Sequence, residues 1–304
     1  MTETELEVPE RTAQPQAAGQ APARMETDTR SQRVFVIRPA PRWPHLDFGE
    51  LWHFRELLAT FVWRDIKVRY KQTLLGVFWA ILVPVFTAAI YVIVFGKFAK
   101  FPAGKTPYAL VVLGGLLPLQ YFTSSLTNSS ISLVANAGLV TKVYFPRVLL
   151  PLAAVLVPLV DLVIAMGILV GLMAWYGTWP VGAEVLLAPA FLGLALLAAL
   201  GAGFLLSAVN VRYRDVPYAI PVFLQVLPLV SAVPYAFNEI PEKWQWLLSI
   251  NPMTAVVTGW RWTILGAAPP DPAKLAVSVA VTGILVLVGL TYFRSSEPKF
   301  ADTI

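Results

Sequence analysis

The chain has 304 residues, of which 57% are hydrophobic and 13% are charged, and its formal net charge is +5. Soluble domains carry nearer to a quarter charged residues, and here the apolar residues fall in long runs from Leu74 onward, so an ordinary soluble protein is excluded. The modest positive charge indicates membrane topology and contact with anionic lipids rather than nucleic-acid binding, and the absence of cysteine excludes disulfides, thiolate metal sites and a cysteine nucleophile.

Residues 1–44 are polar and rich in proline. Such a composition cannot bury enough apolar surface to offset the entropy lost on ordering. We therefore expect a disordered cytoplasmic tail over 1–44 and a membrane domain over 45–304. No compact apolar run follows the first basic residues, so we expect no cleavable signal peptide.

The segment 48–64 has the pattern of an amphipathic helix that lies in the membrane interface. At helical spacing its polar residues gather on one face and its apolar residues on the others, and the segment is too charged to span. An amphipathic helix of a soluble domain is the alternative, and a spanning segment within ten residues argues against it. A basic cluster follows directly, consisting of Arg64, Lys67, Arg69 and Lys71.

Six apolar segments then predict an all-α integral membrane protein with six transmembrane helices. We place them near 74–96, 108–133, 149–175, 185–208, 217–236 and 273–293. A helix over 74–96 rises roughly 35 Å, which is enough to cross the hydrocarbon core with some tilt.

Lysine and arginine near the segment ends indicate the orientation. With a cytoplasmic N-terminus, the inside flanks hold more of these residues than the outside flanks, although the loop 97–105 carries three lysines on the outside. An even number of spans then places both termini in the cytoplasm.

The stretch 235–268 is too polar to span and too apolar to be solvated. It contains four tryptophans and is interrupted by Pro241 and Pro252. We expect short re-entrant helices here before the last span, because broken backbone at membrane depth is tolerated only where protein or a wet cavity covers it.

Motifs spread along the chain resemble the ABC-2 permeases that export polysaccharides, a family with O-antigen, capsule and teichoic-acid exporters. The resemblance extends from about residue 48 to 294 and begins in the stretch 64–84, RDIKVRYKQTLLGVFWAILVP. Its pieces, in family order, are Arg64-Asp65, Arg69-Tyr70, Leu75-Gly76, Trp79, Pro84, Phe145-Pro146-Arg147, Asp161, the stretch 210–216, Pro241-Glu242-Lys243-Trp244, Asn251-Pro252-Met253, Gly259 and Arg261. The chain departs from the family pattern in its long N-terminal tail and at Ser231-Ala232-Val233-Pro234, where Ser-Pro-Val is expected.

The resemblance implies a transport subunit of the bacterial inner membrane and not an enzyme. Two copies of the permease would form a homodimer, and two copies of a separate ATPase subunit would bind it from the cytoplasm. ATP and magnesium would belong to that partner, so this chain would hold no cofactor. A lipid-linked polysaccharide would pass between the two permeases.

Two sets of polar residues are candidates for substrate handling. Arg64, Lys67, Arg69 and Lys71 lie where cations at headgroup depth can hold a pyrophosphate, the alternative being topology and anionic lipid alone. Asp161 lies within the third span, where a carboxylate is costly. It is either a proton relay or, as we favour, a structural acid, because the sequence places no other ionisable group beside it.

The segment 135–147, ANAGLVTKVYFPR, joins the second and third spans on the cytoplasmic side. A short helix here would dock in a groove of the ATPase subunit, the alternative being a plain loop. The loop 210–216 is a second docking candidate. The coupling candidates are Asn136, Lys142, Tyr144, Phe145, Arg147, Arg212, Arg214 and Asp215.

Aromatic residues recur in the first two spans. Aromatic faces suit the apolar faces of sugar rings and impose little directional bonding, whereas lipid contact and helix packing are the alternative roles. The channel-lining candidates are Phe78, Phe86, Tyr91, Phe95, Tyr121 and Phe122.

Other functions stay open. An ABC-2 exporter of a drug or small lipid fits the same motifs, and a proton-coupled secondary transporter would rely on Asp161. A membrane glycosyltransferase would need an acidic site at a membrane face, which we do not find. The segment 99–106 resembles a phosphate-binding loop only superficially, because Ala99 replaces its first glycine and Pro107 follows it. The sequence contains no Ser-His-Asp set and no metal-binding cluster.

Overall fold

The computed structural model describes residues 48–71, 76–101, 106–180 and 182–304. The predicted tail 1–44, most of the loop 99–106 and the start of the first predicted span lie outside the described residues. Within them every regular element is a helix, which confirms the all-α prediction for this part of the chain.

Five helical stretches of the described chain are long and apolar enough to cross a membrane. They are Phe78–Phe98, Tyr108–Ala135, Leu149–Tyr176, Ala183–Arg212 and Pro272–Lys299. Each coincides with a predicted span to within a few residues. The elements that build them are α3 (Gly76–Tyr91) with the π-helix η1 (Val92–Phe98), α4 (Tyr108–Ala135), α6 (Leu149–Leu156) with α7 (Pro158–Tyr176), η2 (Ala183–Leu187) with α8 (Ala188–Arg212), and α12 (Pro272–Ser296).

The third span consists of two helices because Pro158 lacks a backbone N–H and begins a new helix there. The hydroxyls of Tyr121 and Ser125 on α4 both donate to the Val155 carbonyl at 3.3 Å. Side chains of a neighbouring helix thus bond the backbone beside the break, which is needed where water is absent.

The fifth predicted span, 217–236, is shorter in the structure than expected. Its helix α9 (Val216–Val230) has 15 residues, a rise of about 22 Å, which is less than the hydrocarbon thickness of ~30 Å. The helix ends early because Ala232 has a positive φ of 57° and Pro234 cannot continue a helix. The prediction of six full-length helices is therefore corrected to five and one shorter apolar helix among the described residues.

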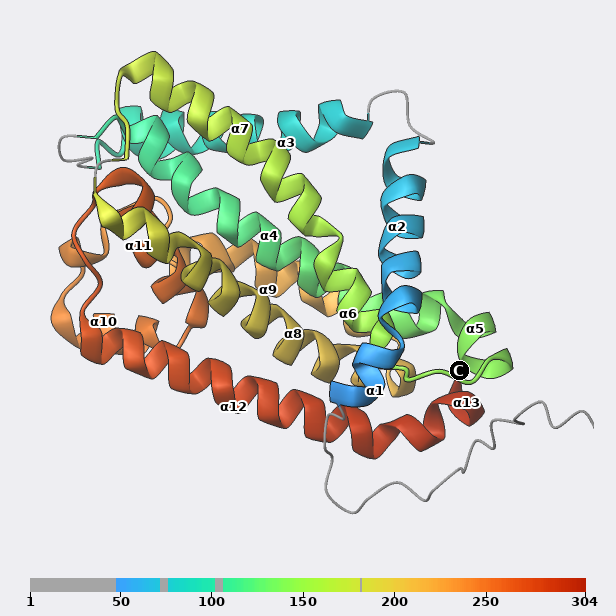
Figure 1. The fold of residues 1–304 in the computed structure, drawn as a ribbon. Helices are drawn as coiled ribbons and strands as arrows, with labels where there is room; N and C mark the ends of the chain where they lie inside the picture. The colour runs from blue at the N-terminus through green and yellow to red at the C-terminus, as the bar shows by residue number, and fades with distance from the viewer. Residues whose placement is uncertain (1–47, 72–75, 102–105, 181) are drawn as a thin grey trace, which may run out of the picture. The chain divides into compact units, whose positions relative to one another are not determined.

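The N-terminal amphipathic segment forms α1 (Phe48–His53) and α2 (Arg55–Lys71). The helix continues seven residues beyond the predicted end at 64, so the whole basic cluster lies on its last turns. Figure 1 shows that α2 runs across the direction of α12, as expected for a helix in the interface plane.

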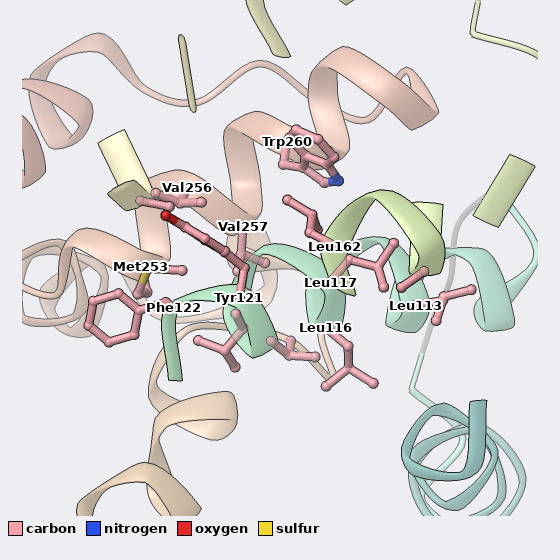
Figure 2. Packing of buried hydrophobic residues seen from close by; sticks show 14 of the residues in the cluster. Leu113, Leu116, Leu117, Tyr121, Phe122, Leu162, Met253, Val256, Val257 and Trp260 are labelled. Atoms are coloured by element: carbon pink, nitrogen blue, oxygen red, sulfur yellow. The ribbon is translucent and has the colours of Figure 1, made fainter. Parts of the chain in front are cut away.

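Helices α4 and α8 form the centre of the bundle. Helix α4 packs against α6, α7, α8 and α11 (Pro252–Leu265), and α8 packs against α12 along much of its length. A Cβ at Gly289 of α12 would overlap the Gly201 carbonyl of α8, so small residues permit the close approach of these helices. Figure 2 shows the core around Tyr121, Phe122 and Trp260.

The stretch predicted to be re-entrant contains η3 (Phe237–Glu239), α10 (Glu242–Ser249) and α11. Arg261 of α11 is only 5% exposed and bonds both α4 and the non-helical backbone between α9 and η3. Its guanidinium donates to the carbonyls of Val111 (2.9 Å), Ala232 (2.8 Å), Tyr235 (3.3 Å) and Val233. The short helices agree with the prediction, and their depth in a membrane stays a prediction.

The opposite end of the bundle carries α5 (Ala137–Lys142), η4 (Glu297–Lys299) and α13 (Phe300–Thr303). Phe300 is buried against Phe293 of α12, and their ring centroids are 5.3 Å apart. The C-terminal residues are thus part of a second apolar core, which also includes Phe61 of α2 and Phe145.

Candidate functional site

Two of the four basic-cluster residues bond to other helices. Arg64 pairs with Asp65 (Nε–Oδ1 2.8 Å) and donates from Nη2 to Asn136 Oδ1 at 3.0 Å. Arg69 Nη2 lies 2.6 Å from Asp161 Oδ2 on α7. The cluster therefore joins α2 to the end of α4 and to α7.

The remaining two cations, Lys67 and Lys71, have exposed side chains. Lys67 Nζ lies 5.3 Å from the centroid of the Trp63 ring, also on α2. These lysines face outward at the interface helix, where anionic headgroups are the expected neighbours.

The expectation that no ionisable group lies beside Asp161 is wrong. Arg69 forms an ion pair with it and the Tyr70 hydroxyl donates to Oδ1. Burial, and then the hydrogen bond to Asp161, raise the pKa of Tyr70 above its ordinary value, so the hydroxyl keeps its proton and remains a donor. Because the helix break at Pro158 places Asp161 in the first turn of α7, the helix dipole also favours a carboxylate there.

Three cavities meet at Arg69. The first, about 410 Å³, lies between α3, α4 and α7 and is also lined by Asp161. The second, about 380 Å³, lies between α2, α4 and α6. The third, about 470 Å³, lies between α3, α4 and α9. The Arg69 side chain therefore lines all three cavities.

A polar face of α4 runs along these cavities. It consists of Gln120, Thr123, Ser124, Thr127 and Asn128, which are all half-buried. Their spacing of three and four residues places them on one side of the helix. We did not identify this face from the sequence, although its periodicity within the segment 108–133 was a usable signal.

The predicted channel-lining aromatics fall into two groups. Phe78 and Phe86 on α3 are 49% and 64% exposed, and Tyr91 packs against Phe95 with ring centroids 5.4 Å apart. Tyr121 and Phe122 are instead buried in the core beside Met253 (Figure 2). Tyr121 nevertheless lines the first cavity, whereas Phe122 lines none of the three cavities at Arg69.

The predicted coupling segment contains the short helix α5, as expected. Lys142 and Tyr144 are exposed at its end, whereas Phe145 is buried, with its ring centroid 5.6 Å from that of Phe61. Asn136 bonds to Arg64, as described above. The end of the segment thus exposes Thr141, Lys142, Val143 and Tyr144, while Phe145 and Asn136 attach it to the bundle.

The second coupling candidate lies between α8 and α9. Arg212, Arg214 and Asp215 are all exposed there, and the Arg212 guanidinium lies 5.3 Å from the centroid of the Tyr213 ring. Arg147 belongs to neither exposed group, because its guanidinium donates to the Glu297 carbonyl.

The membrane-length helices define a multi-pass membrane protein, and cavities within the bundle that are lined by both polar and apolar side chains suit a transport protein. The sequence pattern of the ABC-2 type transporter family matches residues 56–265, more than half of the chain. The chain belongs to this family. It is accordingly a transport subunit of the cytoplasmic membrane without an ATPase domain, and members of the family pair with ABC ATPase subunits and bind no cofactor themselves.

Three relatives show how far the similarity extends. The O-antigen export system permease protein RfbA of Klebsiella pneumoniae is 27% identical over 249 residues, which cover 82% of this chain and 95% of the relative. RfbA of Myxococcus xanthus is 28% identical over 257 residues, covering 84% and 98%. The polysialic acid transport protein KpsM of Escherichia coli is 25% identical over 239 residues, covering 77% and 91%.

Proposed function

We propose that this chain is the permease of an exporter that moves a lipid-linked polysaccharide, most closely of the O-antigen type, across the cytoplasmic membrane. Separate ATPase subunits drive the transport. The names of the relatives support this substrate class. The observation that carries it is the position of the Arg69 guanidinium, where three cavities and the polar face of α4 meet.

The functional unit is a homodimer with two ATPase subunits, and the polymer passes between the two permeases. In support, α3 and α9 expose large apolar and aromatic side chains, including Phe86 at 64%, Tyr218 at 81% and Phe223 at 76%. Phe78, Phe86, Tyr91 and Phe95 remain lining candidates, and Tyr121 lines the first cavity. Aromatic faces let a sugar chain slide because they make few directional bonds.

The basic cluster binds the phosphate end of the lipid carrier. Arg69 is central because guanidinium pairs bidentately with phosphate, and its side chain is 41% exposed toward the cavities. Arg64, Lys67 and Lys71 add positive charge at headgroup depth. Asp161 is the counter-ion that orients Arg69, and this role replaces that of a proton relay.

Conformational changes of the ATPase subunits are transmitted to the permease through α5 and through the loop 210–216. Both elements carry exposed cations, Lys142 on one side and Arg212 and Arg214 on the other. In this arrangement both termini are cytoplasmic. The sixth crossing consists of α9 and the non-helical backbone after it. The Arg261 guanidinium donates hydrogen bonds to the Ala232 and Val233 carbonyls of that backbone.

The test is transport by vesicles that contain the permease and an ABC ATPase subunit. We expect ATP-dependent movement of a lipid-linked polysaccharide and none of a small cationic drug. Arg69→Gln should reduce polymer transport at least tenfold, whereas Lys243→Gln, which removes an exposed cation on α10, should leave it unchanged. Transport of the drug alone, or full transport by a correctly inserted Arg69→Gln variant, would refute the proposal.

A further inference from the structure

The last eight residues of the chain are held firmly to the bundle. Phe300 is 1% exposed and Phe293, against which it packs, is fully buried. Phe293 in turn contacts Phe204 of α8, with ring centroids 5.6 Å apart. An aromatic residue buried on both sides anchors a segment with a few kcal/mol, so residues 297–304 are an integral part of this end of the molecule.

Glu297 fixes this segment to the loop that follows α5. Its Oε1 accepts from the backbone N–H of Arg147 at 3.1 Å, and its Oε2 pairs with Arg294 Nη1 at 2.9 Å. The Glu297 carbonyl accepts from the Arg147 guanidinium. Both carboxylate oxygens are engaged, and the side chain is only 18% exposed. Loss of the carboxylate charge removes an ion pair whose two side chains are both less than one-fifth exposed.

These contacts place the C-terminal segment beside the predicted coupling helix. Helix α13 packs against α5, and Figure 1 shows the two side by side. The exposed side chains of Lys142 and Tyr144 therefore continue into those of Lys299, Asp302 and Thr303. Together these positions expose one aromatic residue, Tyr144, on elements that also expose charged residues, a combination that suits a protein interface.

We propose that α5 and residues 297–304 together form the docking surface for the ABC ATPase subunit, with Glu297 as the positioning residue that sets α5 against the C-terminal segment. This inference rests on the proposed docking of α5. It adds that the C-terminus is part of the contact and that an interaction within the permease determines its shape.

The surface can be mapped with single cysteines because the chain has none of its own. We would label Tyr144→Cys and Thr303→Cys with a maleimide, with and without the co-expressed ATPase subunit. Both positions should react at least tenfold more slowly in the complex. Glu184→Cys, an exposed position at the far end of the bundle, is the control and should react at the same rate in both samples.

The outcomes separate this inference from the proposal on which it rests. Protection of Tyr144→Cys alone would overturn the role of the C-terminal segment and leave docking of α5 intact. Protection of neither position would overturn the docking of α5 as well. Protection of Thr303→Cys alone would contradict a joint surface.

The positioning role is tested with Glu297→Gln, which keeps the shape of the side chain and removes its charge. We expect the complex to assemble and the number of ATP molecules hydrolysed per polymer transported to rise at least threefold. Glu242→Gln, on an exposed position of α10, is the matched control. If Glu297→Gln leaves the number of ATP molecules hydrolysed per polymer unchanged, whether or not its thermal stability falls, Glu297 has no part in coupling.

Discussion

Asp161 and Arg69 show how a charged pair is accommodated in a membrane protein. A single charged side chain is energetically costly beside lipid. Here the opposite charges of Arg69 and Asp161 offset each other, and the Tyr70 hydroxyl donates a further hydrogen bond to Asp161. The two residues are far apart in sequence and meet because α2 continues as a helix to Lys71. This geometry predicts strong coupling between the two positions.

We expect Arg69→Gln and Asp161→Asn each to lower the free energy of unfolding, because each removes the ion pair between the two residues. The double variant should be about 1–2 kcal/mol more stable than the sum of the two losses predicts, a value reduced from that of a fully buried pair because Arg69 is partly exposed. Denaturant unfolding in detergent measures this. Strictly additive losses would show that the ion pair contributes no coupling.

Arg261 makes a different use of positive charge, since its partners in the structure are four backbone carbonyls. Lysine has three donors at a single point and cannot reproduce the planar fork of the guanidinium. Arg261→Lys should therefore destabilise the protein by about 2–4 kcal/mol. The control is Arg214→Lys at an exposed position, and equal unfolding midpoints for the two variants would contradict this role.

Among the helices, the apolar runs of the sequence predicted the ends of the spans better than the breaks within them. Five spans agree with the sequence because length and hydrophobicity determine them. The backbone after α9 is bonded by Arg261, which lies about thirty residues further along the chain. The extension of α2 was missed because the predicted helix was ended at residue 64, where the basic cluster begins, whereas the cluster lies on the last turns of the helix.

The contact between α8 and α12 gives a prediction with an internal control. Gly289→Ala places a methyl group against the Gly201 carbonyl, which should cost about 1–3 kcal/mol by overpacking. Gly283→Ala on the same helix meets no atom within 4 Å and should stabilise slightly through better helix propensity. Thermal unfolding of the two variants checks this, and a Gly289→Ala midpoint at or above that of Gly283→Ala would contradict the close packing.

For the whole molecule, the orientation and the sixth crossing can be tested together. Single cysteines at Arg214 and Glu242 flank α9 and the backbone that follows it, and both positions are exposed. In intact cells with a permeabilised outer envelope, an impermeant maleimide should label Glu242→Cys and not Arg214→Cys. Labelling of both positions from the same side would show that this region does not cross the membrane.

The candidate site was only partly predictable. The basic cluster and Asp161 stand out in the sequence because charge is rare near membrane segments. Their connection depends on the packing of α2 against α6, which brings Arg69 to Asp161 and which periodicity does not reveal. The burial of Tyr121 and Phe122 was not predictable for a related reason, because helical spacing does not distinguish a face toward a channel from a face toward another helix.

Helix α2 is attached at two points to helices that belong to different parts of the bundle. Arg64 holds Asn136, the residue directly before α5, and Arg69 holds Asp161 on α7. The two arginines are five residues apart, or about 7.5 Å along the helix axis. We expect α2 to transmit motion between these two points. Displacement of α5 by the ATPase subunit would move Arg64, tilt α2 and separate Arg69 from Asp161. The Arg69 guanidinium would then become available to a phosphate of the substrate during the ATPase cycle.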